Sequence, residues 1–99
     1  MLTLPIKKKW FDMIRSGEKK EEYREVKPYY DKRLDSKYIW GDRFEVIFRN
    51  GYSKNSPSIK CLVEFQKGYG HTMWGAELNK IYYVLKILSV EEFKNGTMD

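Results

Sequence analysis

Residues 10–24, WFDMIRSGEKKEEYR, set the organisation of this chain. They join the end of an expected helix, Ile6–Ser16, to a strongly charged segment, Glu18–Val26. Apolar residues recur at helical spacing before the junction. Gly17 then supplies the left-handed residue that commonly ends a helix. The sequence therefore predicts a short helix that turns directly into a strand.

The charged segment is unusual for a strand. It holds four glutamates, two lysines and an arginine in nine residues. A strand with one buried face normally alternates apolar and polar residues, and this one offers only Tyr23 and Val26 to a core. Two interpretations follow. The segment is either an exposed edge whose surface ion pairs protect it from aggregation, or a strand whose charges are paired across a cleft.

The spacing of three charged residues bears on the second interpretation. Regular alternation puts Glu22 and Arg24 on one face of the strand and Lys19 on the other. All three share a cleft only if Lys19 still belongs to the turn that precedes the strand. Arg24 would then offer its planar fork to a phosphate or carboxylate. Lys19, desolvated by Trp10 and Tyr23, would have a lowered pKa and act as a base.

Composition points to a small basic domain. Ninety-nine residues form one domain, residues 1–99, with a formal charge of +5 and an isoelectric point near 9.3. This balance favours a polyanionic partner. Three Trp, eight Tyr and five Phe are more rings than one small core needs. Exposed rings beside positive charge are typical of surfaces that stack nucleic-acid bases.

The rare residue types exclude several classes of site. Cys61 is the only cysteine, so the sequence allows no internal disulfide. One cysteine and one histidine, His71, do not make a zinc site, and we expect neither a metal nor a cofactor. No apolar run approaches the length of a membrane span, and the first residues lack the apolar core of a signal peptide. We therefore expect a soluble, cytoplasmic protein.

Hydrophobic patterns predict four more strands besides the charged segment. They are Leu2–Ile6, Arg43–Arg49, Ile59–Phe65 and Ile81–Leu88. The second and third alternate cleanly between apolar and polar residues, which indicates one buried face. The last is nearly continuous in apolar residues, which indicates burial on both faces. The predicted fold class is α+β, a small mixed five-stranded barrel with two or three short helices.

The remaining segments are short or irregular. A helix beginning at Pro28 is expected to place Tyr29, Tyr30 and Leu34 on one face. Residues 67–80 form the longest irregular stretch, and long loops in small domains are often functional. Residues 89–92 resemble a capping box at the start of a final helical turn. Residues 95–99 are expected to be loose.

The motif at Gly17-Glu-Lys19-Lys-Glu-Glu22-Tyr-Arg24 fits the pattern G-x-K-x-x-E-x-R. It resembles the signature of the ASCH domain family (activating signal cointegrator homology), whose barrel is similar to that of PUA domains. The flanking FDMIRSGEK, the turn Trp40-Gly41-Asp42 followed by FEVIF, and the run GAELNKIYYVLKI also resemble compact bacterial and phage-type members. The resemblance covers essentially the whole chain. It implies a cleft between helix and barrel, lined by the signature residues, that binds RNA or a nucleotide.

The same resemblance implies an alternative activity. Some small members are amidohydrolases of N4-acetylcytidine, and others have been assigned ribonuclease activity. The amidohydrolases use a lysine at the position of Lys19, a threonine at the position of Glu22 and a downstream glutamate. Here a carboxylate stands in place of the hydroxyl, which changes the available chemistry. Glu77, in the loop before the last strand, is the candidate downstream acid.

Other candidate ligand-binding residues lie at strand ends and in loops. Arg49, Asn50 and Tyr52 either read a base edge or a phosphate, or simply form a tight turn. Trp74 either stacks on a base as a lid or covers the barrel mouth. His71 is expected to have no catalytic task.

Three functional hypotheses follow. The first is a binding module for RNA or a nucleotide, which uses Lys19, Glu22, Tyr23 and Arg24 together with the loop residues above. The second is a hydrolase of a modified nucleoside or of RNA, with Lys19 and either Glu22 or Glu77 as acid–base groups. The third is a protein-interaction module whose basic face meets an acidic partner.

Overall fold

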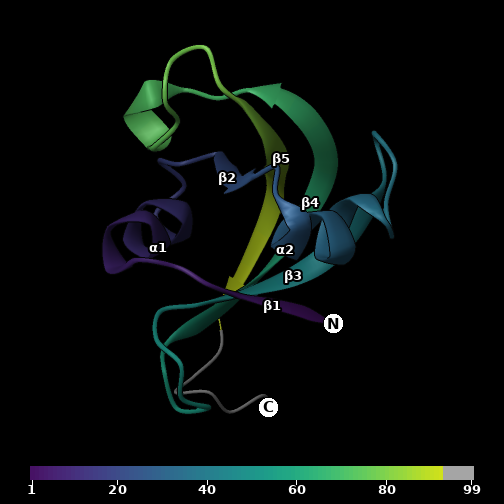
Figure 1. Ribbon diagram of the computed structural model, residues 1–99. Helices are drawn as coiled ribbons and strands as arrows, with labels where there is room; N and C mark the ends of the chain where they lie inside the picture. The colour runs from purple at the N-terminus through teal and green to yellow at the C-terminus, as the bar shows by residue number, and fades with distance from the viewer. Residues whose placement is uncertain (93–99) are drawn as a thin grey trace.

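The computed structural model describes residues 1–92 and contains five strands with short helical segments between them (Figure 1). The tail predicted for residues 95–99 lies outside the described residues. The strands are β1 (Leu2–Pro5), β2 (Glu21–Glu25), β3 (Arg43–Arg49), β4 (Ser58–Tyr69) and β5 (Ile81–Glu92). The helical segments are α1 (Lys8–Arg15), α2 (Pro28–Tyr30), the π-helical turn η1 (Asp31–Asp35) and the 3₁₀ turn η2 (Thr72–Trp74).

All five strands form one mixed sheet in the order β1-β3-β4-β5-β2. β1 runs parallel to β3, and every other pair is antiparallel. The two long central strands, β4 and β5, carry a bulge at which Leu88 is inserted opposite Leu62 and Val63. A bulge bends the strands and increases their twist. The sheet curls into a half-barrel, and β1 and β2 are its two edges (Figure 1). The predicted mixed five-stranded sheet with short helices is confirmed.

The main core fills the concave side of this sheet. As predicted, β3 and β4 alternate, and each turns one apolar face inward. The inward residues of these two strands are Val46, Phe48, Ile59, Cys61, Val63 and Phe65. β5 is buried on both faces over its first half, as its continuous apolar run predicts. Tyr83 and Leu85 join the main core, while Tyr82 and Val84 pack with Ala76 in a second, smaller cluster.

Helix α1 links the two edge strands. The sequence predicted this helix over Ile6–Ser16, whereas in the structure it extends over Lys8–Arg15 with Lys7 as the N-terminal cap residue. Phe11 and Ile14 are buried against the core, as the helical spacing predicts. Gly17 adopts a φ of +85° and ends the helix. The chain therefore leaves β1, crosses the open side of the half-barrel as α1 and returns as β2 (Figure 1).

Several sequence predictions were wrong in detail. Residues 89–92 continue β5 instead of starting a helical turn, because they pair with the beginning of β4. β4 runs on to Tyr69, so the irregular stretch predicted from residue 67 begins later. Tyr29 does not share the inward face with Leu34, since it is 47% exposed. Over residues 1–92, no helix has the length and apolar character needed to cross a membrane.

Candidate functional site

Strand β2 turns its charged side chains inward. Glu22 and Arg24 pair with Leu85 and Tyr83 on β5, so both charged residues lie on the core face of the sheet. Both are buried. The prediction that Tyr23 and Val26 face a core was wrong for Val26, and Tyr23 faces the second cluster and not the main core. Val26 is 47% exposed, and Tyr23 packs on the second cluster behind the sheet.

Lys19 joins them from outside the strand. β2 begins only at Glu21, and the backbone N–H of Lys19 donates to the carbonyl of Met13 at the end of α1 (2.9 Å). This bond holds Lys19 in the turn that follows the helix, so strand alternation does not govern its direction. Its side chain is fully buried and reaches Glu22. The condition stated for a shared cleft, that Lys19 belong to the turn, is met.

The three residues form one buried ionic cluster, which we call the Lys–Glu–Arg cluster (Lys19, Glu22 and Arg24). Each carboxylate oxygen of Glu22 has its own cation. Oε1 lies 3.3 Å from Nζ of Lys19. Oε2 accepts from Nη2 and Nε of Arg24 at 2.6 and 3.1 Å. Buried charges persist only when they are paired and hydrogen-bonded, and this carboxylate supplies both cations with a counter-ion.

Arg24 also ties the two edges of the half-barrel together. Its Nη2 donates to the carbonyl of Pro5 at the end of β1 (2.8 Å), and its Nη1 donates to the hydroxyl of Tyr30 (3.0 Å). β1 and β2 are not hydrogen-bonded neighbours in the sheet. The guanidinium therefore bridges the opening between them. Four of its five N–H donors are used by protein groups.

The environment of Lys19 disfavours its charged form. Burial is the main cause that lowers the pKa of this amine, and the nearby Glu22 carboxylate partly opposes the shift. The ammonium nitrogen also lies 4.9 Å from the Trp10 ring and 4.8 Å from the Tyr23 ring. Such cation–π contacts favour the charged form. Its remaining partner is the backbone carbonyl of Trp74, at 2.6 Å.

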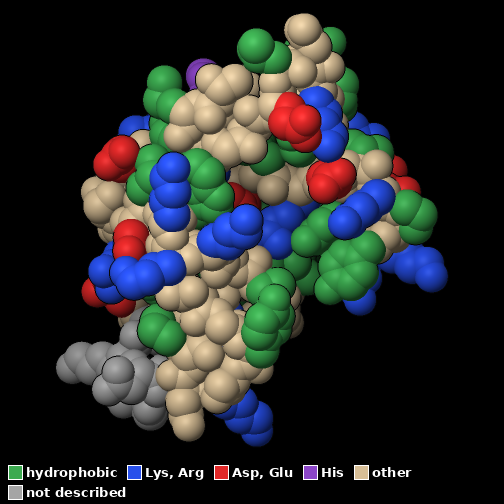
Figure 2. Space-filling model, turned by 60° about the vertical axis from the view of Figure 1, so that its left-hand side comes forward, with side chains coloured by type: hydrophobic (Ala, Val, Ile, Leu, Met, Phe, Trp, Pro, Cys, Tyr) green, Lys and Arg blue, Asp and Glu red, His purple; other side chains and the backbone are tan. Residues whose placement is uncertain are grey.

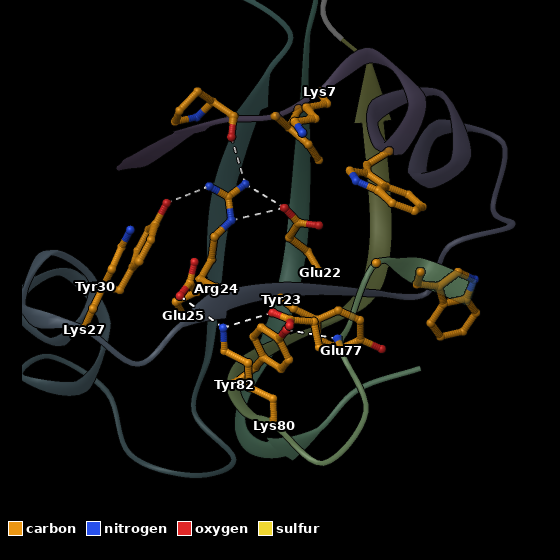
Figure 3. Close-up of a pocket in the computed structure, with 15 residues that line it drawn as sticks. Lys7, Glu22, Tyr23, Arg24, Glu25, Lys27, Tyr30, Glu77, Lys80 and Tyr82 are labelled. Carbon is orange, nitrogen blue, oxygen red and sulfur yellow. Dashed lines mark hydrogen bonds and ion pairs between the residues drawn. The ribbon is translucent and has the colours of Figure 1, made fainter. Parts of the chain in front are cut away.

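A cavity of about 410 Å³ opens next to the cluster, between the ends of β1 and β2. Glu22 and Arg24 form part of its wall (Figure 3). Lysines and carboxylates surround its mouth, and basic side chains border the hollow on this face of the molecule (Figure 2). Its other charged lining residues are Lys7, Glu25, Lys27, Glu77 and Lys80. Its aromatic lining residues are Trp10, Tyr23, Tyr30, Trp74 and Tyr82.

The loop between β4 and β5 covers one side of this cavity. We call residues 70–80 the cover loop. Side chains from the sheet and from the Lys–Glu–Arg cluster hold its backbone at three points. The Tyr23 hydroxyl accepts from the N–H of His71 (2.9 Å), and the Tyr82 hydroxyl accepts from the N–H of Glu77 (3.0 Å). The third point is the bond from Lys19 to the Trp74 carbonyl.

Glu77 reaches the cavity wall but not the Lys–Glu–Arg cluster. Its carboxylate is 73% exposed and pairs with Nζ of Lys80 at 3.2 Å. Lys80 in turn pairs with Glu25 at the same distance (Figure 3). His71 contributes its backbone N–H to the cover loop, and its ring lies edge-on to Trp74 with centroids 4.8 Å apart.

The predicted residues after β3 lie apart from this cavity. Arg49 donates to Ser58 (3.2 Å) on the neighbouring strand. Asn50 and Tyr52 line a second hollow of about 330 Å³, which meets the first at Lys7 and the end of β1. Tyr52 is 93% exposed. The structure thus places five of the predicted residues in the cavity wall: Glu22, Tyr23, Arg24, Trp74 and Glu77. Lys19 is enclosed behind this wall and contacts it through Glu22. Arg49, Asn50 and Tyr52 do not line the cavity.

The lining residues that sequence reasoning missed include Glu25, Lys80 and Tyr82. Their positions depend on the pairing of β2 with β5, which places Glu25 opposite Tyr82. No local pattern specifies that pairing. Within residues 1–92, no group of three or more histidine, cysteine or carboxylate side chains has the arrangement of a metal site.

The chain was compared with protein-family models, with curated proteins and with solved structures, and none of them matches it.

Proposed function

We propose that this protein is an ASCH-like domain that binds RNA or a nucleotide in the cavity beside the Lys–Glu–Arg cluster. The observation that carries the proposal is that Glu22 and Arg24 line one pocket while their charges are buried and paired, Glu22 with both Arg24 and the enclosed Lys19. These residues are far more buried than a surface ladder of ion pairs requires. Burying charge is costly, and a ligand site is the kind of place where proteins retain buried ionisable groups.

The net positive charge of the cluster and of the pocket mouth favours an anionic ligand. The buried cluster contains two cations and one carboxylate, and exposed Lys7 and Lys27 add positive charge at the mouth without a carboxylate partner among residues 1–92. The carboxylates on the opposite side are paired with Lys80. A phosphate group entering on the Lys7 side would balance this excess and use the remaining donor of Arg24.

The aromatic side chains of the pocket are suited to stacking on a nucleobase. Aromatic side chains line the pocket from α1, β2, α2 and the cover loop. Base–aromatic stacking contributes about 1–3 kcal/mol per base and tolerates different sequences. The volume is also within the usual range for a small-molecule site, roughly 300–1,000 Å³. A site of this size accommodates one nucleotide unit rather than a duplex.

Binding experiments test the proposal directly. We expect the double variant Lys7→Gln/Lys27→Gln to bind nucleoside 5′-monophosphates and short single-stranded RNA about tenfold more weakly at moderate salt, because two cations no longer meet the phosphate. The matched control is Lys20→Gln/Lys54→Gln, which removes the same charge from exposed positions outside the cavity. Fluorescence polarisation and calorimetry measure both. The proposal is wrong if neither probe binds, or if both double variants weaken binding equally.

A hydrolase is the second candidate, and the buried Lys19 favours it. Burial lowers the pKa of this amine, which makes Lys19 easier to deprotonate than an exposed lysine and so a candidate base. Glu22, with both oxygens in ion pairs, is poorly placed to act as a nucleophile. Incubation with N4-acetylcytidine and with short RNA, followed by chromatography, tests this candidate. Turnover lost in Lys19→Arg, which cannot act as a base, supports it, and no product at high protein concentration excludes it.

A further inference from the structure

A third hollow, which is basic, lies beside the first residues of β1, at the opposite end of this strand from the nucleotide pocket. It has a volume of about 580 Å³, and its walls come from the first residues of the chain and from the segment 32–38. Lys32, Arg33 and Lys37 line it, together with Leu2, Thr3 and Tyr38. No acidic residue among residues 1–92 contributes to the wall. We call this hollow the η1 groove, because η1 supplies Lys32 and Arg33.

The acidic and basic side chains of η1 point in different directions. Its two acidic residues point away from the groove: Asp31 accepts from the buried Tyr83 hydroxyl, and Asp35 pairs with Lys67 of β4 (3.3 Å). Lys32 and Lys37 are exposed and have no carboxylate within ion-pairing distance in the described part of the chain. A short segment that contains equal numbers of acids and bases therefore presents only bases to the groove.

A chain of contacts joins this groove to the proposed nucleotide pocket. Tyr30 lines the pocket. The ring of Tyr29 lies edge-on to the ring of Tyr30, with centroids 4.9 Å apart. The guanidinium of Arg33 stacks over the Tyr29 ring at 3.5 Å and donates to the Tyr29 carbonyl (2.9 Å). Tyr29 is half exposed. Two rings and one guanidinium thus form a continuous line of contacts from one hollow to the other.

Both hollows follow the unpaired edge of β1. Pro5 lines the pocket, and Leu2 and Thr3 line the η1 groove. A strand of four residues extends on the order of 10 Å, which is a few nucleotides of a single strand at most. Proteins that bind single strands combine a basic groove for the backbone with rings for successive bases. The two hollows and the tyrosines between them have this composition.

We propose that the η1 groove holds the phosphate backbone of a single-stranded nucleic acid whose terminal or extruded nucleotide occupies the pocket. This inference rests on the proposed function and adds that the ligand is a strand, not a free nucleotide. Lys32, Arg33 and Lys37 contact phosphates, and Tyr29 offers its exposed ring to the adjacent base.

The test compares a strand with a mononucleotide. The variant Lys32→Gln/Arg33→Gln/Lys37→Gln and the control Lys20→Gln/Lys54→Gln/Lys86→Gln lose the same charge, and the control residues line neither hollow. Probes are a labelled single-stranded RNA of about ten nucleotides, the DNA of the same sequence, and the nucleoside monophosphates that bind the wild-type protein. Binding is measured by fluorescence polarisation over a series of salt concentrations, and circular dichroism compares the folding of the variants.

We expect the η1 variant to bind the RNA at least tenfold more weakly than the control variant and to keep its affinity for monophosphates within about twofold. The slope of log affinity against log salt should fall by about 0.7 for each phosphate that no longer meets a cation. Equal RNA affinity in the two folded variants, or an equal weakening for strand and monophosphate, would overturn the inference while the pocket proposal stands. Wild-type protein that binds neither probe overturns both. If the η1 variant also binds the DNA probe more weakly, this supports the groove as the site of phosphate contact, since RNA and DNA share the phosphate backbone.

Discussion

Glu22 is the residue on which the buried cluster depends most, because its single carboxylate is the counter-ion of two buried cations. Its two oxygens contact Lys19 and Arg24 separately, and all three side chains are almost fully enclosed. Replacing a whole buried ion pair by apolar residues is often tolerated, whereas removing one partner leaves a charge without compensation. The carboxylate therefore stabilises the fold more than any exposed ion pair on the surface.

We expect Glu22→Gln to lower the free energy of unfolding by about 3–5 kcal/mol, because it leaves two buried cations facing a neutral amide. Urea unfolding followed by circular dichroism measures the change. Glu18→Gln removes an exposed carboxylate a few residues earlier and should change stability by less than about 0.5 kcal/mol. A similar destabilisation in both variants would show that the cluster is not specially stabilised by Glu22.

Gly75 is the second residue with a strict requirement. It follows η2 with a φ of +101°, and a Cβ atom there would lie 2.9 Å from the Trp10 ring. We expect Gly75→Ala to cost about 1–3 kcal/mol, because it combines left-handed strain with a clash. Gly68→Ala is the matched control, since its Cβ would meet nothing within 4 Å. Thermal unfolding should separate the two, and equal melting temperatures would contradict this account.

At the scale of elements, the cover loop depends on side chains from outside itself. It contains no strand and only the short turn η2. Its backbone is held by hydroxyls on β2 and β5 and by the ammonium of Lys19. A segment with few internal bonds opens at low free-energy cost when its anchors are removed. The two tyrosines thus position one wall of the cavity.

We expect Tyr23→Phe to increase hydrogen exchange in residues 70–80, because the N–H of His71 loses its acceptor. One hydrogen bond corresponds to about 1 kcal/mol, and the effect should be largest in the peptide that contains His71. Mass spectrometry of exchanged peptides measures it. Tyr52→Phe, at a strongly exposed position, is the control. Unchanged exchange in the cover loop would mean that the Tyr23 hydroxyl does not hold it.

At the scale of the whole molecule, the sequence predicts the sheet better than the site. β3 appears with its predicted bounds, Arg43–Arg49, because one buried face imposes strict alternation on a strand. β2 breaks this rule, since its buried face is ionic. Only the resemblance of its motif to a family signature indicated that Lys19, Glu22 and Arg24 meet. Lys80 and Tyr82 depend on the pairing of strands distant in sequence, which no local pattern encodes.

The behaviour of the whole molecule at alkaline pH follows from its buried titratable groups. Burial raises the pKa of the Cys61 thiol from its ordinary 9.0 to about 12, and burial also raises the pKa values of Tyr23 and Tyr83. As pH rises, these groups lose protons first in the unfolded chain, so the folded state loses stability. Lys19 has a lowered pKa in the folded state and therefore acts in the opposite direction up to about pH 10.5. The two tyrosines begin to contribute near their ordinary pKa of 10.0, and Lys19 no longer opposes the change above about pH 10.5, so we expect the free energy of unfolding to fall above about pH 10.

The Cys61 contribution can be isolated from the rest. One proton corresponds to a slope of at most about 1.4 kcal/mol per pH unit. Cys61→Ala should be less stable than the wild-type protein at pH 7 because of the cavity it creates, but its stability should decline less between about pH 9 and pH 10.5, because the buried thiol on β4 no longer contributes to the slope. Urea unfolding at a series of pH values measures both slopes. Parallel curves for the two proteins would mean that the thiol titrates alike in the folded and unfolded chains, and that burial does not protect its proton.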